Sequence, residues 1–195
     1  MAKYFLLLIS LSLISICADA QKLEVAVNYV TADATVTKQV IYYSPATKLV
    51  WNDFNGKPDK NSEAAAITNA GLGFKMDFHS KDNSATLNIV IDCIFSKNES
   101  WLKGGKKTTY ILNHEQHHFD IAYLFAMHFL HDLKTAKYSL KDYNKTIENI
   151  YYHNQSELMT MQNDYDAETK NSQLTDQQAL WDKKIDAAVL ATSKQ

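Results

Sequence analysis

A long segment with helical apolar spacing constrains the fold of this 195-residue chain more than any other part of it. It begins at about residue 108 or 109 and runs to about residues 134–137. Apolar residues recur along it at helical steps and cover most of its surface, which is typical of a buried helix. The other elements must therefore pack around this helix. Its apolar residues are Tyr110, Ile111, Leu112, Phe119, Ile121, Ala122, Leu124, Phe125, Met127, Phe129, Leu130 and Leu133.

The first half of this segment carries an H-E-x-x-H pattern at His114, Glu115 and His118. Positions i and i+4 lie about 40° apart around a helix and about one turn along it, so the two imidazoles project together and can hold one metal ion. Glu115 can then reach a water in the open coordination position and take its proton. Because such groups are costly to bury unless they are paired or bound to a metal, the pattern predicts Zn²⁺ and metal-assisted hydrolysis. A hydrogen-bonded structural cluster of histidines is the alternative.

The order of the remaining patterns predicts the fold class. Strand patterns come first, at residues 22–30, 40–43, 73–79 and 85–95, with the last two joined as a hairpin and a short helix at 62–70 before them. Helical patterns follow at 140–170, antiparallel to the central helix, and at 175–190, capped by Thr175-Asp176. This order favours an α+β fold in which an N-terminal antiparallel β-sheet packs against a C-terminal layer of long helices.

Charge and the N-terminus limit the partners and the compartment. The formal net charge is −2 and the chain contains no arginine, so nucleic acid is not expected as a partner. Residues 1–20 read as a secretory signal peptide with an Ala18-Asp19-Ala20 cleavage site, which predicts a secreted or periplasmic single domain over 21–195. Cys17 leaves a lipoprotein as the alternative. The mature chain shows no transmembrane segment, and Cys93, its only cysteine, excludes an intrachain disulfide.

Several scattered motifs resemble one family, the predicted secreted zinc-dependent proteases catalogued as a bacterial domain of unknown function. The string H-E-Q-x-H-F-D-I is much more specific than H-E-x-x-H alone. The resemblance implies a zincin-like fold and protease activity, with the strand at 85–95 lining the cleft by analogy with zinc peptidases. The chain departs from the family at Lys170-Asn171, where His-Gly usually follows the Y-D-x-E-T segment. The motif residues are Trp51, Phe54, Gly56, Pro58, Ser100, Trp101, His114–Ile121, Tyr165, Asp166, Glu168, Thr169, Gln178 and Trp181.

A catalytic zinc site needs a third protein ligand. An antiparallel helix that starts near Ser139 returns to the level of His114 at roughly position 164, at about 1.5 Å per residue. The resemblance selects Asp166 and Glu168 at that level. Only one of them should ligate, because two residues apart on a helix they face different ways. The longer side chain favours Glu168 as a ligand, with Asp166 as the alternative.

Two more residues are candidates for catalysis. His117 could flank the site and stabilise the oxyanion that develops in hydrolysis, or it could be an ordinary histidine on the helix face. Tyr165 could offer its O–H to the same intermediate, or simply pack between helices. Asp120 points about 200° away from His118, which suits an orienting role better than metal ligation.

Together these features predict an exported zinc hydrolase, most simply a metallopeptidase acting on a peptide or another amide. The alternative is a non-catalytic envelope protein with a structural metal site or an interaction role. A structural zinc is closed by four protein ligands, whereas a catalytic one leaves a position for water, so the ligand count discriminates between the two. The sequence does not indicate an oligomeric state.

Overall fold

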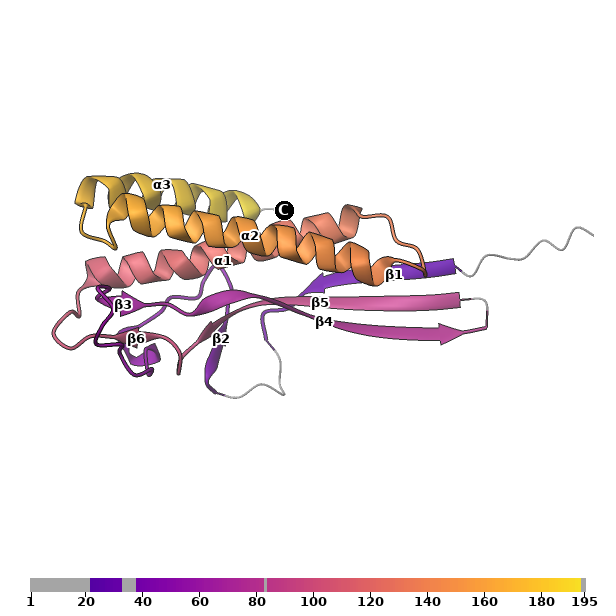
Figure 1. The fold of residues 1–195 in the computed structure, drawn as a ribbon, viewed down its shortest axis with the longest axis horizontal. Coiled ribbons are helices and arrows are strands. Elements are labelled where there is room, and N and C mark those ends of the chain that lie inside the picture. The colour runs from indigo at the N-terminus through magenta and orange to yellow at the C-terminus, as the bar shows by residue number, and fades with distance from the viewer. Residues whose placement is uncertain (1–21, 33–37, 83, 194–195) are drawn as a thin grey trace, which may run out of the picture.

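The computed structural model describes residues 22–32, 38–82 and 84–193. The predicted signal peptide, its cleavage site and Cys17 lie outside these residues. Within them the chain forms an α+β fold in which a mixed sheet packs against three helices (Figure 1).

Strand β5 (Ser84–Ser96) is the centre of the main sheet. It pairs antiparallel with β4 (Ala70–Lys81) as the predicted hairpin. Its other edge pairs with β1 (Lys22–Tyr29) and, further along, with β2 (Val40–Tyr42). A second, two-stranded sheet joins β3 (Ala66–Ile67) to β6 (Trp101–Leu102), and a 3₁₀ turn, η1, covers Trp51–Asp53.

The apolar face of β5 forms the floor of the core, as its alternating pattern predicted. Its inward side chains are at most 1% exposed, while residues between them are partly or fully exposed. This period of two follows from the pleat, which sends successive side chains to opposite faces of a sheet. The inward residues are Ala85, Leu87, Ile89, Ile91, Cys93 and Phe95.

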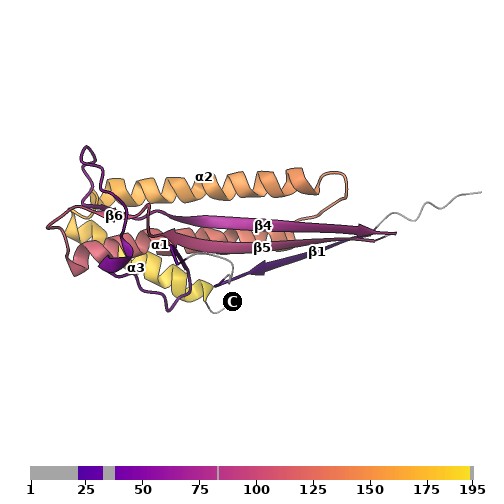
Figure 2. The ribbon, with the colours of Figure 1, turned by 90° about the horizontal axis from the view of Figure 1, so that it is seen from below.

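Helix α1 (Thr109–Thr135) lies between the sheet and the other two helices. It packs on β4, β5 and β1 and also contacts α2 (Tyr143–Thr169) and α3 (Thr175–Thr192), which Figure 2 shows on either side of it. A helix covered from both directions needs apolar residues on several faces, which explains the broad apolar pattern of its sequence. No helix in residues 22–193, as far as these are described, is long and apolar enough to cross a membrane.

Two expectations about the fold were wrong. The sheet is mixed rather than antiparallel, because β1 runs parallel to β5. The short helix expected at 62–70 is absent; Ser62 accepts a hydrogen bond from the Ala64 amide, and β3 pairs with β6 instead. Strand pairing and the burial of Ala64 and Ala66 override the helical preference of the alanines, which is only a weak local bias.

Residues outside the helices that carry the family resemblance hold the loop before β3 against the core. The rings of Trp51 and Phe54 pack at 5.1 Å, and Phe54 packs on Phe95. Gly56 donates its amide to the Ser100 carbonyl, and a Cβ at Gly56 would meet that oxygen at 2.8 Å, so the close approach requires glycine. This part of the motif set is therefore structural.

Candidate metal centre

The start of α1 brings His114 and His118 together. Thr108 caps the helix by accepting a hydrogen bond from the Ile111 amide at 3.1 Å, so the helix is regular from the turn before the first histidine. The two rings lie one turn apart with centroids 4.8 Å apart and their Nε2 atoms 3.2 Å apart. Both nitrogens point to the same spot, as the i, i+4 spacing predicted.

Helix α2 supplies the third group, and it is Asp166. Its Oδ1 lies 3.1 Å from Nε2 of His114 and 3.1 Å from Nε2 of His118. Ligands about 2.1 Å from a tetrahedral metal ion are about 3.4 Å apart, so these three atoms are spaced as one ion would require. The three side chains could therefore hold a metal ion.

Two glutamines fix the orientation of the two imidazoles. Nδ1 of His114 lies 2.8 Å from Oε1 of Gln178, and Nδ1 of His118 bonds to Oε1 of Gln162. The amide nitrogens of these glutamines donate elsewhere, to Asp182 Oδ1 at 2.6 Å and to the His118 carbonyl at 2.9 Å, so each Oε1 faces its histidine. A carbonyl oxygen only accepts, hence each Nδ1 carries the proton and each Nε2 offers a lone pair to the centre.

The charges at the centre favour a bound cation. Burial opposes protonation of His118, but the neighbouring carboxylates of Asp166 and Glu115 outweigh this effect and raise its pKa. Burial acts against the charged form of Asp166 as well, yet hydrogen bonds from His114 and His118 hold its pKa well below the usual range. The carboxylates thus stabilise positive charge at the imidazoles, and the imidazoles stabilise negative charge on Asp166.

Glu115 lies beside these three residues with an unused oxygen. The residue is 3% exposed, and its Oε2 is buried with no hydrogen-bond partner among the described residues. Burial raises the pKa of this carboxyl above its ordinary value. Thr68, just after β3, donates to the Glu115 carbonyl at 3.0 Å and fixes the backbone there. A buried oxygen without a partner is expensive and suits a group that receives a proton.

A small cavity of about 10 Å³ lies among Glu115 and the three candidate ligands. That is room for about one water molecule. Ala65, Ile111, Asn171 and Ser172 line both this cavity and a larger one of about 730 Å³ next to it. The centre therefore has space for one small ligand and opens toward a groove of substrate size.

The strand predicted to line the cleft does not do so. Both edges of β5 are paired, with β4 on one side and β1 and β2 on the other, so an extended peptide has no edge to join there. Ala66 and Ile67 of the short strand β3 line the small cavity instead. Two residues were too short a pattern to identify as a strand from the sequence.

Glu168, the favoured third ligand, lies elsewhere. Its Oε2 accepts a hydrogen bond from the Trp181 indole at 2.7 Å and so ties α2 to α3. Asp166 reaches the histidines because its position on α2 faces α1, so the longer side chain of Glu168 gives that residue no advantage.

The two additional catalytic candidates also lie away from the cavity. Tyr165 stacks on His114 with ring centroids 4.5 Å apart, and its hydroxyl contacts Gln178 Nε2 at 2.5 Å and the His114 carbonyl at 3.4 Å. It supports His114 from behind rather than facing a substrate. The His117 ring is directed toward α3, where Asp182 and Asp186 approach it. Neither residue lines the cavity.

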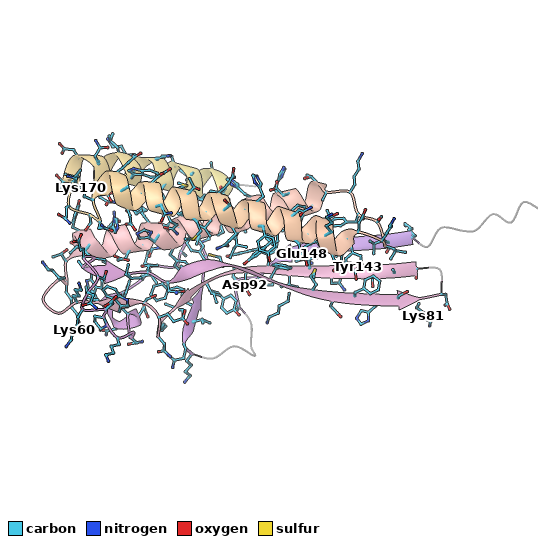
Figure 3. The ribbon with its side chains drawn as sticks, viewed as in Figure 1. Lys60, Lys81, Asp92, Tyr143, Glu148 and Lys170 are labelled. Carbon is cyan, nitrogen blue, oxygen red and sulfur yellow. The ribbon has the colours of Figure 1, made fainter. Side chains whose placement is uncertain are left out.

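Sequence reasoning missed Gln162 and the turn after α2, and it named Gln178 as a motif residue without giving it an orienting role. Gln162 lies four residues before Asp166, on the same side of α2, and this spacing was its only signal. Lys170, Asn171 and Ser172 have φ of 47°, 49° and 67°, in the left-handed region. Figure 3 labels Lys170 at this turn, at the end of the helical layer. The turn begins at Lys170-Asn171, where the sequence differs from the motif that it otherwise resembles, and it brings Asn171 and Ser172 to the cavity.

The geometry thus defines a His–His–Asp centre with an adjacent buried glutamate, at the junction of the sheet and the helices. Comparison with models of protein families returned no match for this chain. Comparisons with curated proteins and with solved structures returned none either.

Proposed function

We propose that this protein is a zinc-dependent hydrolase, most simply a metallopeptidase, with a zincin-like arrangement of its site. The observation that carries the proposal is the convergence of three lone-pair atoms, two Nε2 and one carboxylate oxygen, beside the unpartnered Oε2 of Glu115. In the absence of a proton or a cation these atoms would repel one another at 3.1–3.2 Å. The donor set fits zinc, which takes imidazole nitrogen and carboxylate oxygen.

His114, His118 and Asp166 would hold the ion, while Gln178 and Gln162 keep the two imidazoles in the required tautomer. When bound, zinc lowers the pKa of a coordinated water to about 7 and polarises a carbonyl. Glu115 would take up a proton from a water on Oε2 and return it to the leaving amine. Its raised pKa suits this exchange, because a group that takes and returns a proton works best near the operating pH.

The ligand count favours catalysis over a structural metal. Three protein ligands are in place, and the cavity beside them has room for about one water. A structural zinc would need a fourth protein ligand there, but the residues that complete the lining are Ala65, Ala66, Ile67, Ile111, Asn171 and Ser172. The groove of about 730 Å³ next to the centre is the natural place for a substrate. Residues 1–20 support the related proposal that the enzyme is exported.

The test is a Glu115→Gln variant of the mature chain. It should retain zinc and lose hydrolysis of peptides, or of cell-wall fragments with amide cross-links, by at least about a hundredfold, in line with general-base contributions. A chelator should abolish wild-type activity, and zinc should restore it. A variant that hydrolyses as fast as the wild type would remove Glu115 as the base. A wild-type protein that binds zinc but releases no product from either substrate class would favour the structural alternative.

A further inference from the structure

A second His–carboxylate cluster lies on the other side of α1, between α1 and α3. His117 of α1 is 2% exposed and faces three aspartates. Its Nε2 lies 3.4 Å from Asp186 Oδ1 and 3.9 Å from Asp120 Oδ2, and these three atoms lie within 4.8 Å of one another. The cluster shares no ligand residue with the centre described above.

This histidine is oriented in the way that metal-binding histidines are. Its Nδ1 lies 3.1 Å from Asp182 Oδ1. Asp182 is itself held by the Gln178 amide at 2.6 Å and by the Asn113 amide at 3.1 Å. A carboxylate on one ring nitrogen directs the lone pair of the other nitrogen outward, which is the common arrangement around bound metals. Nε2 is thus directed at the gap between Asp186 and Asp120.

Asp120 contributes a charge that its neighbours neutralise only in part. It is 3% exposed, and its Oδ1 accepts hydrogen bonds from the Tyr43 hydroxyl at 2.8 Å and the Gln116 amide at 2.9 Å. These bonds fix the carboxylate and direct Oδ2 toward His117. Three carboxylates around one imidazole leave an excess of negative charge even when the ring is protonated. Of these carboxylates only Asp120 is buried, and an ion of opposite sign beside it would offset the cost of burying its charge.

We propose that His117, Asp120 and Asp186 form a second site, for a divalent transition-metal ion such as Zn²⁺ or Mn²⁺. One imidazole and two carboxylates suit these ions. The side chain of Asp186 is 70% exposed, so the site is reached from solvent, and water can complete the coordination. The exposed Asp186 side chain can adjust to an ion, whereas His117 and Asp120 are held by their buried contacts.

The site does not depend on the proposed hydrolase activity, and metal stoichiometry tests it directly. The mature chain, stripped with a chelator, is titrated with Zn²⁺ alone and then with Mn²⁺ alone. The wild type should bind two Zn²⁺ ions, and Asp186→Asn should bind one. Asp164→Asn is the matched control, because it removes an exposed carboxylate from the neighbouring helix and should leave two ions. Asp186 is exposed, so its replacement should not impair folding.

A His118→Ala variant separates the two sites. It should lose the first ion and keep the second, and adding Asp186→Asn should then abolish binding. If the wild type binds a single ion that His118→Ala removes and Asp186→Asn leaves in place, the second site does not exist. A single ion that Asp186→Asn removes and His118→Ala leaves would support the second site and overturn the first. Absence of any bound ion in the wild type would overturn both.

Discussion

Replacing Gln162 by leucine tests whether an orienting side chain sets the metal affinity of the first site. Gln162 makes two hydrogen bonds to His118: its Oε1 accepts from Nδ1, and its Nε2 donates to the main-chain carbonyl at 2.9 Å. Leucine has a similar size but can make neither of these hydrogen bonds. The imidazole then keeps its position in the helix but loses the group that fixes its tautomer and ring orientation. Losses of this kind typically lower metal affinity ten- to a hundredfold, or about 1.4–2.7 kcal/mol.

The same change should reduce stability. It leaves the His118 Nδ1–H without its acceptor, and a buried donor left unsatisfied costs about 1–3 kcal/mol. In a chain of this length each kcal/mol lowers the unfolding temperature by about 2–4 °C. Scanning calorimetry of the metal-free protein should therefore show a decrease of about 2–12 °C.

Zinc affinity is best measured by competition with a chromophoric chelator. The control is Gln155→Leu, which makes the same substitution about two turns earlier in α2 and should leave zinc affinity unchanged. If Gln162→Leu binds zinc within about twofold of the wild type, the glutamine does not orient His118, and the inferred tautomer loses its main support.

Three further outcomes follow from the contacts at the first site. Asp166→Ala should weaken zinc binding by at least about a hundredfold in the same competition assay, because it removes a ligand that approaches both histidines. Glu168→Ala should leave zinc affinity unchanged and lower the free energy of unfolding by about 1–3 kcal/mol in urea titrations, since the buried Trp181 indole loses its acceptor; a reversed order would make Glu168 the ligand. Glu115→Gln should raise the unfolding temperature of the metal-free protein by about 2 °C or more. Burial raises the pKa of Glu115, so its charged form costs stability at neutral pH, and the gain should shrink as pH falls through that raised pKa.

The sequence predicted the elements whose patterns are long. The helical segment at 109–135 and the alternating strand at 84–96 each repeat their period several times, and both were found within a few residues of their predicted limits. The only helical signal in the segment at 62–70 was the preference of its few alanines, and the pairing between β3 and β6 outweighed that preference. The parallel direction of β1 depends on where the chain crosses the sheet, and a strand pattern carries no information about direction.

The candidate site likewise has features that the sequence predicted and features that it did not. The juxtaposition of His114 and His118 follows from the helical period alone. The side chains that orient them come from α2 and α3, so their roles depend on how three helices pack. The sequence left two roles open for His117, one flanking the site and one as an ordinary histidine on the helix face, for the same reason. Its position three residues after His114 suggested a flanking role, but α3 covers that face of α1 and supplies Asp182 and Asp186 there.

The candidate third ligand shows that a helical pattern predicts more when the buried face of the helix is considered together with the position along its axis. The buried stripe of α2 includes Leu158, Tyr165 and Thr169. At about 100° per residue, position 166 lies about 100° to one side of Tyr165, and position 162 lies about 60° to that same side. Position 168 lies about 60° to the other side, which faces Trp181 of α3. Their positions along the axis of α2 did not distinguish Asp166 from Glu168. Their angular positions around that axis, relative to the buried face, do distinguish them: Asp166 faces the histidines, and Glu168 faces α3.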